Sequence, residues 1–512
     1  MSEDREHARS GRRSVLDMPA AEFRTLGYEL VDQIAGFYDS LAGRPSQRRL
    51  TRASGPGDVQ ALLGPEEFPE EGMDADRLLA DIVPLLFDRS LHNGHPRFMG
   101  YITSSAAPLG ALAELLAAAL NANLARWELS PVASEIESRT VRWIADFIGY
   151  DDKASGLMVS GGNMANFTAF VAARTAMVPW DIRKQGNGGD TRLPTAYVSA
   201  ETHTWVQKAA DVCGLGADGI RWIDTCADGG MDVDQLRERI EEDRANDRLP
   251  FLVVGTAGSV SLGVVDPLRT LAAICKSEGL WLHVDGAYGA PAAALPEAPD
   301  DLHALGLADS VAVDPHKWLY CPIEVATVLS RHQEALRKAF SFSPEYYRLA
   351  GRGATGTDYH ELGMQNTRGF RALKVWLMCR AAGRSGYRDS IREDIRLAER
   401  LYDRVQQHPE LTGHAVRLSI ATFRFVPPDL ADNRSDATED YLDDLNQAVL
   451  AELQAGGDLF LSNAVVRGRY LLRACIVNFR TTEADIDAVP ELVVQLGRRL
   501  DAELRPAGLS GN

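Results

Sequence analysis

The residue best suited to covalent chemistry is Lys317, in the segment Asp-Pro-His-Lys-Trp at 314–318. A short apolar run at 310–313 precedes this segment and is typical of a buried strand. Lysine is rarely placed among apolar residues without a functional cause, and burial favours the neutral amine, which is the nucleophilic form. Lys317 is therefore a candidate imine-forming amine, although a lysine here could also extend its ammonium group to the surface.

Two further polar residues follow apolar runs of the same kind. Asp285 comes after the run at 280–284, where a carboxylate could face a cationic ligand nitrogen or cap the next turn. His203 comes shortly after the run at 196–199, although a lone histidine is also common as a structural residue. Ligands bind at the carboxyl ends of strands in open α/β sheets, so both side chains are candidates for a binding site.

A glycine turn, Ser-Gly-Gly-Asn at 160–163, lies between an apolar run at 157–160 and a predicted helix at 164–174. Glycine lets backbone N–H groups approach an anion, and the start of a helix adds N–H groups and a partial positive charge. The turn predicts a phosphate site, with an ordinary strand-to-helix turn as the alternative. It matches neither the G-x-G-x-x-G nor the Walker pattern of nucleotide-binding proteins.

Together these features meet the requirements of pyridoxal 5′-phosphate. The amine of Lys317 can bond the aldehyde, and the glycine turn can hold the phosphate. The carboxylate of Asp285 can keep the ring nitrogen protonated, which makes the ring an electron sink for a carbanion at the substrate Cα. His203 can lie on one face of the ring and Ala287 on the other. No metal ion is expected in such a site.

The elements that position these residues are predicted to form an α/β fold. Between 107 and 330, helical stretches alternate with short runs that are apolar on both faces. This pattern is typical of a mostly parallel sheet with helices on both sides. From about 370 the sequence changes to long helices and two strands, at 416–425 and 470–479, with a capped helix starting at Thr482. This region predicts a smaller C-terminal α+β domain.

The N-terminal part is predicted to be helical. Apolar residues at spacings of three and four indicate a helix at 20–41 that needs a partner surface. A connector rich in Pro, Gly and Arg follows at 43–73, and an apolar helix lies at 109–124. The chain therefore divides into a disordered tail at 1–14, an N-terminal helical segment at 15–95, a large cofactor-binding domain at 96–375 and a small domain at 376–512.

The composition disfavours several other classes of protein. The 512 residues include 54 Lys and Arg against 72 Asp and Glu, a net charge of −18, which disfavours nucleic acid or an anionic membrane surface as a partner. The six cysteines form no Cys-x-x-Cys pair and predict reduced thiols in a cytoplasmic protein. The polar segment at 1–13 is not typical of a secretory signal, and no stretch predicts a membrane span.

The sequence resembles the group II pyridoxal-phosphate-dependent amino acid decarboxylases, the family that includes aromatic-L-amino-acid decarboxylase. The matching segments are 95–98, 127–131, 160–166, 283–288, 314–318 and 366–376. The resemblance implies the type I, aspartate aminotransferase-like fold. It also implies a homodimer with the active site at the two-fold interface, in which the N-terminal helix exchanges between subunits.

The resemblance assigns a role to each matching position. Lys317 would be the Schiff-base lysine, Asp285 would pair with the ring nitrogen, and His203 would stack on the ring and orient the substrate carboxylate. The remaining cofactor contacts would be Thr256 near the ring, Ala287 on its far face, and Gly161, Gly162, Asn163 and His316 at the phosphate. Tyr359 belongs to a segment at 341–369 that is expected to be mobile, and it would protonate the Cα of a substrate in the partner's site.

Two positions depart from the pattern of this family. Asn163 stands where many relatives have a small hydroxyl residue, and its amide can still donate to phosphate. Asp314 stands where some relatives have Asn. Because a carboxylate is repelled by a phosphate dianion, we expect Asp314 to hold nearby backbone N–H groups and not to touch the phosphate.

The substrate side chain is less determined by the sequence. Tyr101, Ile102 and Trp127 predict an apolar pocket, which favours an aromatic L-amino acid. The residues that leave room for an aliphatic or acidic L-amino acid are Asn123 and Ala125, which could change the pocket, and Arg97 and Arg126, which could receive a distal carboxylate.

Other activities on the same fold are alternatives. An aldehyde synthase consumes oxygen and releases ammonia and hydrogen peroxide, and such relatives typically have Phe in place of the loop tyrosine, so Tyr359 favours a decarboxylase. The segment at 314–318 disfavours an aminotransferase. A non-catalytic relative is disfavoured by the intact Lys317, Asp285 and His203.

Overall fold

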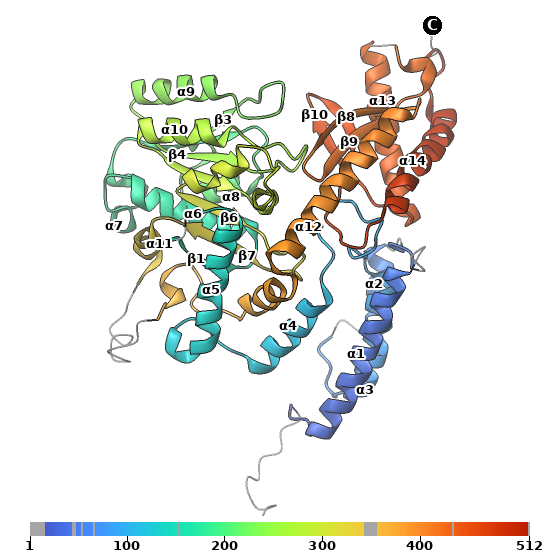
Figure 1. The fold of residues 1–512 in the computed structure, drawn as a ribbon, viewed down its shortest axis with the longest axis horizontal. Coiled ribbons are helices and arrows are strands. Elements are labelled where there is room, and N and C mark those ends of the chain that lie inside the picture. Colours follow the sequence, from blue (N-terminus) through green and yellow to red (C-terminus); the bar gives the residue numbers. More distant parts are fainter. Residues whose placement is uncertain are drawn as a thin grey trace, which may run out of the picture.

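The computed structural model describes residues 16–43, 48–52, 55–64, 67–151, 153–342, 356–432 and 435–509. These residues form an α/β domain, a smaller C-terminal domain and a helical N-terminal arm (Figure 1). The tail expected at 1–14 lies outside the described residues.

A seven-stranded sheet forms the centre of the α/β domain. In sheet order its strands are β1 (Ser155–Val159), β7 (Ala326–Ser330), β6 (Ser310–Val313), β5 (Trp281–Asp285), β4 (Leu249–Thr256), β2 (Pro194–Ser199) and β3 (Ile220–Ile223). Strand β7 is antiparallel to both neighbours, whereas the pairs from β6 to β3 are parallel. The predicted mostly parallel sheet is confirmed, but β3 and β7 were not predicted. Strand β3 lacks the fully apolar pattern because it lies at the sheet edge, where Trp222 is exposed.

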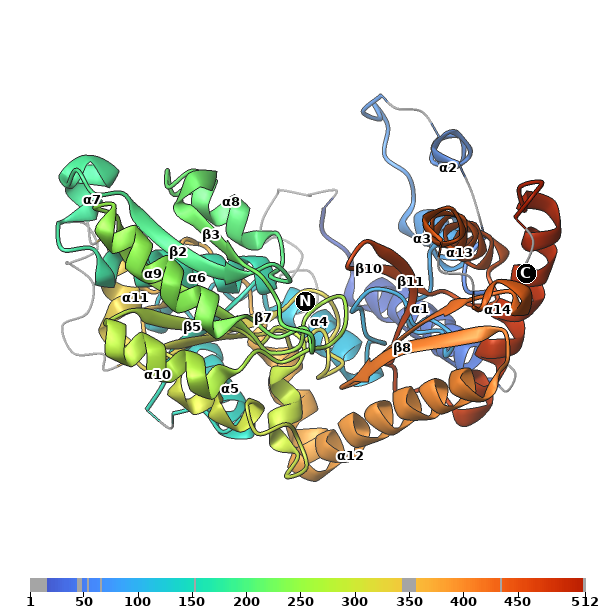
Figure 2. The same ribbon diagram turned by 90° about the horizontal axis from the view of Figure 1, so that it is seen from above.

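Helices cover both faces of this sheet (Figure 2). One face packs against α6 (Gly162–Met177), α8 (Trp205–Val212) and α11 (Gln333–Phe340), and the other against α5 (Pro131–Phe147), α9 (Val233–Ala245) and α10 (Leu268–Glu278). Successive side chains of a strand point to opposite faces. Leu252 and Val254 of β4 therefore enter the first core, and Val253 enters the second.

The C-terminal domain contains an antiparallel sheet in the order β10 (Ser462–Val466), β11 (Arg469–Cys475), β9 (Ile420–Phe425) and β8 (Leu411–Arg417), packed against α13 (Asp436–Gly456) and α14 (Glu483–Leu504). The single strand predicted at 416–425 is wrong. Leu418 adopts a φ of 48°, and the chain reverses there to pair β8 with β9. The strand predicted at 470–479 ends at Cys475. The cap predicted for α14 is confirmed, because the N–H of Thr482 donates to Asp485 at 3.0 Å.

Helix α12 (Ala372–Gln407) connects the two domains and crosses the boundary placed at 375/376. It packs against α4 (Pro108–Leu120) and α5 in the large domain, and against β8 and α14 in the small one. Gly383, with φ 64° and ψ 177°, breaks the helix between these contacts.

The N-terminal arm consists of α1 (Ala20–Ala42) and α3 (Ala75–Arg89), which pack against each other, with α2 (Pro56–Leu62) between them in sequence. Helix α1 confirms the helix predicted at 20–41, and α2 lies within the stretch expected to be an extended connector. The arm projects away from the α/β domain (Figure 1). Its exposed apolar side chains include Phe23, Tyr28, Val31, Leu78, Ile82 and Leu86, and α4 exposes Leu112, Leu115, Leu116 and Leu120.

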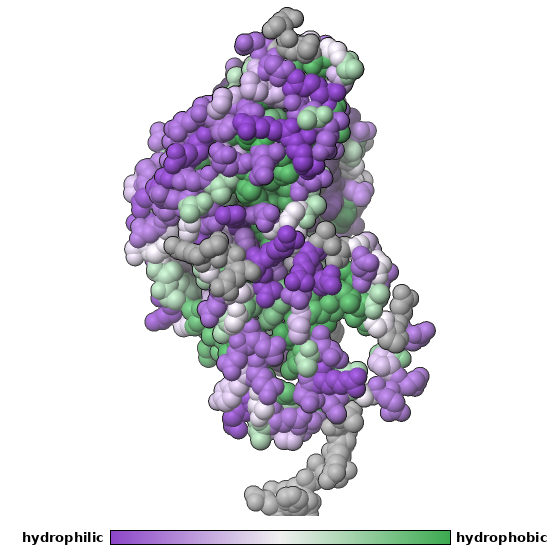
Figure 3. Space-filling model, turned by 90° about the vertical axis from the view of Figure 1, so that its right-hand side faces the viewer, coloured by the Kyte–Doolittle hydropathy of each residue, from purple (hydrophilic) through white to green (hydrophobic). Residues whose placement is uncertain are grey.

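Hydrophobic patches interrupt the polar surface on the face of the molecule drawn in Figure 3. Among the helices that the structure describes, none combines the length and the apolar composition needed to cross a membrane.

Candidate active site

Lys317 lies in the turn that follows β6. Its side chain is half-buried, and its Nζ lies 3.2 Å from Oδ2 of Asp314. Trp318 anchors the turn, because its indole Nε1 donates to the buried carboxylate of Asp394 at 2.9 Å. The sequence predicted a lysine placed among apolar residues. In the structure the amine of Lys317 instead faces a carboxylate at the wall of a pocket.

Asp285 ends β5 and is buried. Its Oδ2 accepts a hydrogen bond of 2.8 Å from the indole Nε1 of Trp205, and its Oδ1 accepts the N–H of Ala287 at 3.2 Å. The register of β4 and β5 places Thr256 beside it. Asp285 thus caps the turn, which was the structural alternative considered from sequence, and it also lines the pocket. The contact with Trp205 was missed, and the only sequence signal for it is the position of Trp205 two residues after His203.

His283 lies on the same face of β5 as Asp285 and is buried in the core. Its Nδ1 lies 2.9 Å from Oγ of Ser310, and its Nε2 lies 2.8 Å from Oδ1 of Asn166. Complete burial lowers the pKa of His283 to about 4, so the imidazole is neutral near pH 7.

One pocket brings most of the predicted cofactor residues together. The predicted residues that line it are Ile102, Gly162, Asn163, His203, Thr256, Asp285, Ala287 and Lys317, whereas Gly161, His316, Tyr101 and Tyr359 are not among its lining residues. The pocket walls exclude water from the imidazole of His203 and lower its pKa, against the opposing effect of the Asp285 carboxylate. The Nδ1 of His203 accepts the N–H of Trp205 at 3.3 Å, which places the proton of the neutral ring on Nε2.

The glycine turn forms the N-terminus of α6, facing the turn that carries Lys317. A Cβ on Gly162 would lie 2.5 Å from Oδ2 of Asp314, so a larger residue would fill the space. His316 lies beside Gly161: its Cε1 is 4.0 Å from the position that a Cβ on Gly161 would occupy. The Nδ1 of His316 lies 2.6 Å from the carbonyl oxygen of Val325. The space between Gly161, Gly162 and the turn at 314–317 forms a phosphate cradle. This cradle and the first N–H groups of α6 fit a phosphate.

Asp314 lies in this cradle, and the prediction that it holds nearby backbone N–H groups is wrong. Its side chain is 2% exposed, and its Oδ2 lies 3.2 Å from Nζ of Lys317 and 3.7 Å from Nε2 of His316. Within the described residues its Oδ1 has no hydrogen-bond partner, and no backbone N–H donates to either oxygen. The carboxylate therefore faces the cradle because the turn after β6 points it at the start of α6.

Tyr359 is buried against its own chain, in a short 3-10 helix at Tyr359–Glu361. Its hydroxyl lies 3.5 Å from the carbonyl oxygen of Ser134, and the guanidinium of Arg368 lies over its ring. Arg368 forms a fully buried ion pair with Glu137. Of the segment expected to be mobile, the part at 356–369 is therefore packed against the domain, and the part at 343–355 lies outside the described residues.

Ile102 lines the pocket, whereas Tyr101 has a φ of 52°, is 56% exposed and has its ring tilted by 45° against that of Phe460, with 5.8 Å between the ring centroids. The other residues considered for the substrate side chain have structural partners. Asn123 Oδ1 accepts the N–H groups of Ala125 and Arg368, Trp127 Nε1 donates to Glu135, Arg97 pairs with Asp485, and Arg126 pairs with Glu128.

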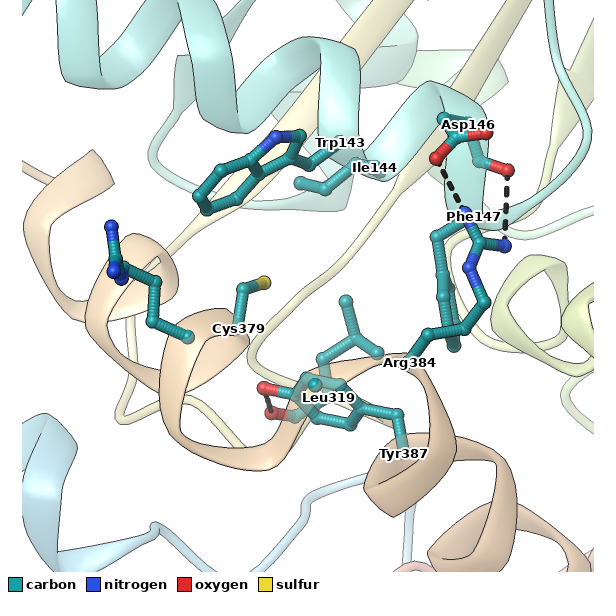
Figure 4. A pocket seen from close by; sticks show the side chains of 10 residues that line it. Trp143, Ile144, Asp146, Phe147, Leu319, Cys379, Arg384 and Tyr387 are labelled. Atoms are coloured by element: carbon teal, nitrogen blue, oxygen red, sulfur yellow. Dashed lines mark hydrogen bonds and ion pairs between the residues drawn. The ribbon is translucent and has the colours of Figure 1, made fainter.

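A second cavity lies between α5 and α12 and is mostly apolar (Figure 4). It is lined by Trp143, Ile144, Asp146, Phe147, Leu319, Cys379, Arg380, Gly383, Arg384 and Tyr387. Its carboxylate, Asp146, pairs with Arg384, and its lining contains no lysine or histidine among the residues that the structure describes. The pocket at Lys317 is the candidate active site, because it brings an amine, a carboxylate, an imidazole and the glycine turn to one space.

A family model described as the pyridoxal-dependent decarboxylase conserved domain matches residues 56–423. The chain belongs to this family. The aromatic-L-amino-acid decarboxylase of Bacillus atrophaeus is 33% identical over 475 residues, which cover 92% of this chain and 94% of the relative. A phenylacetaldehyde synthase from a Rosa hybrid cultivar is 28% identical, with 90% and 91% covered. The crystal structure of Oryza sativa TDC with PLP and tryptamine matches the fold with a TM-score of 0.86 at 24% identity, covering 96% of this chain and 100% of that chain.

This decarboxylase is therefore a carboxy-lyase that uses pyridoxal phosphate, and it has the type I fold. The pocket fits the cofactor on its own geometry: a lysine amine, a carboxylate at the end of β5 and a glycine cradle at a helix N-terminus line one space. Among the described residues, no cluster of His, Cys, Asp or Glu is arranged to hold a metal ion.

Proposed function

We propose that this decarboxylase converts aromatic L-amino acids to the corresponding amines and carbon dioxide. The observation that carries the proposal is the single pocket lined by the amine of Lys317, the carboxylate of Asp285 and the imidazole of His203. Ile102 and Val260 give this pocket apolar surface, and no arginine lines it within the described chain. An acidic side chain would lack a guanidinium partner there, and the relative from Bacillus atrophaeus supports the aromatic class.

The cofactor would be held at three points. Lys317 would bond its aldehyde, the start of α6 with Asn163 would bind its phosphate, and Asp285 would face its ring nitrogen. When bound, pyridoxal phosphate supplies the electron sink for the electron pair left by the departing carboxylate. The negative charge of Asp285 favours the protonated ring nitrogen on which this sink depends.

His203 would cover the ring and orient the substrate carboxylate. Its pKa is lowered and its Nδ1 is occupied by the N–H of Trp205, so its Nε2–H is the group free to donate to an anion. Ala287, on the far side, would allow close packing against the ring because its side chain is small.

Tyr359 would deliver the proton to the substrate Cα in the partner's site. Burial raises the pKa of its phenol, which keeps the hydroxyl protonated at neutral pH. In one chain this hydroxyl is directed at the carbonyl of Ser134 and does not line the pocket. This role therefore depends on a second subunit and on release of Tyr359 from Ser134.

A homodimer and a cytoplasmic location belong to the same proposal. The exposed apolar side chains of α1, α3 and α4 support burial against a second copy, because an unpartnered apolar helix face is costly in water. All six cysteines are free thiols, which supports a reducing compartment. Light scattering of the purified protein tests the dimer.

A substrate panel tests the proposed activity. The protein is loaded with pyridoxal phosphate and supplied with L-tryptophan, L-tyrosine, L-phenylalanine, L-leucine or L-glutamate, and the amine and carbon dioxide are measured. We expect the amine and carbon dioxide to form in equal amounts. We also expect kcat/KM to be at least about tenfold higher for an aromatic substrate than for L-leucine or L-glutamate. Lys317→Ala, the control, should lose turnover. A preference for leucine or glutamate would contradict the aromatic assignment.

An aldehyde synthase is the second candidate, because a phenylacetaldehyde synthase is among the relatives. That reaction consumes oxygen and yields an aldehyde, ammonia and hydrogen peroxide in place of the amine. Tyr359 favours the decarboxylase, and a peroxide assay on the same panel separates the two activities.

A further inference from the structure

Asp314 gives the phosphate cradle an unusual charge. Its Oδ2 lies 2.5 Å from the place that a Cβ of Gly162 would occupy, so the carboxylate reaches the first residue of α6. Its side chain is 2% exposed, and its Oδ1 is buried without a hydrogen-bond partner in the described chain. An unpaired buried oxygen costs free energy unless a ligand or a proton satisfies it.

The charge that balances Asp314 comes from its own turn. Nζ of Lys317 lies 3.2 Å from Oδ2, and Nε2 of His316 lies 3.7 Å from the same oxygen. The other titratable groups that line the pocket are Glu201 and His203 after β2 and Asp285 on β5. Lys317 is also the amine that would bond the cofactor aldehyde, so its ammonium charge would not stay on Asp314 when the cofactor binds.

A phosphate monoester is mostly a dianion above its second pKa of about 6. A dianion beside an ionised carboxylate in a buried site is strongly repelled. One proton placed between the two groups removes this repulsion and creates a short O–H···O hydrogen bond to a charged acceptor.

We propose that this chain binds the cofactor phosphate together with one proton, which Asp314 and a phosphate oxygen share. The proton comes from solvent on binding and returns to solvent on release, and the phosphate forms or breaks no covalent bond. The inference rests on the proposed cofactor site. Its consequence is that the cofactor binds more tightly as the pH falls.

The test compares cofactor affinity in three proteins stripped of cofactor: wild type, Asp314→Asn and Asp300→Asn. Asp300 is exposed and does not line the pocket, so its variant controls for the lost charge. Dissociation constants for pyridoxal phosphate are measured by absorbance between pH 6.5 and 8.5. We expect the dissociation constants of wild type and Asp300→Asn to rise with pH more steeply than that of Asp314→Asn. The difference in slope should be up to about tenfold per pH unit. With pyridoxal, which has no phosphate, the three proteins should share one slope.

Proton uptake by the wild-type protein provides a measurement that needs no variant. Calorimetric titrations at pH 8 in buffers of different ionisation enthalpy count the protons bound with pyridoxal phosphate and with pyridoxal, and we expect a difference of about one. Equal proton counts, or equal slopes for Asp314→Asn and wild type, overturn the inference while the cofactor site stands. Failure of pyridoxal phosphate to bind overturns both the inference and the proposed site.

Discussion

The indole Nε1 of Trp205 donates a 2.8 Å hydrogen bond to Oδ2 of Asp285. The other oxygen of Asp285 accepts the N–H of Ala287, so protein donors fix the plane of the carboxylate. The ring of Trp205 stands edge-on to His283 at 5.8 Å, and both rings are buried. The acid that would face the cofactor ring is therefore oriented by the core and not by the ligand.

Replacing Trp205 by Phe removes this donor and keeps an aromatic ring. We expect kcat to fall about tenfold and the cofactor to dissociate faster, because a hydrogen bond to a charged group contributes about 1.5–3 kcal/mol. Steady-state kinetics and the absorbance of released cofactor measure both effects. Trp222→Phe, at an exposed position on β3, is the control. A variant with unchanged kcat and cofactor release would mean that Asp285 keeps its orientation without the indole.

Replacing Tyr359 by Phe tests the proton donor. We expect amine formation to fall about a hundredfold or more, as is typical when a general acid is lost, with aldehyde and hydrogen peroxide appearing in its place. Product analysis by chromatography and a peroxide assay measure the change. Tyr402→Phe on α12 is the matched control, since within the described residues its hydroxyl accepts a side-chain hydrogen bond from Nε2 of Gln406 at 3.1 Å and lies outside the pocket lining. Full amine formation by Tyr359→Phe would assign the proton to another group.

His283 makes the folded protein sensitive to acid. Its pKa of about 4 in the fold lies below the ordinary value of 6.5, so the unfolded chain binds more protons between these pH values. Its contribution to the free energy of unfolding is complete above pH 6.5 and falls by about 2 kcal/mol between pH 7 and pH 5. Urea unfolding at the two pH values should show a smaller fall for His283→Gln than for wild type. The exposed His303→Gln should behave as wild type, and an equal fall in all three proteins would contradict this assignment.

The buried pair of Glu137 and Arg368 holds the segment that carries Tyr359. Glu137 also accepts the N–H of Met158 at 2.9 Å, and Arg368 donates to the carbonyl of Met158 at 2.7 Å. Glu137→Ala leaves a buried guanidinium unpaired and should lower the free energy of unfolding by about 3–5 kcal/mol. Limited proteolysis should also cut faster near 356–369. Glu241→Ala, on the exposed face of α9, should change neither quantity, and a stable, protease-resistant Glu137→Ala would argue against this anchoring.

Local sequence was sufficient for the elements whose signal lies within a few residues. The apolar run at 310–313 coincides with β6, and Thr482 caps α14 as predicted. Strand β3 and the reversal at Leu418 were missed, because an edge strand is not fully apolar and a positive φ at leucine has no composition signal. The tail at 1–14 lies outside the described residues.

The sequence by itself determined the reactive groups and their place at strand ends, because a buried run followed by Lys317, Asp285 or the glycine turn is a pattern of adjacent residues. Tertiary structure decided which groups touch: Trp205 on Asp285, Asp314 on the start of α6, and Arg368 on Glu137. These partners come from separate elements, and their contacts depend on the order and register of the sheet, which the packing of two whole cores fixes.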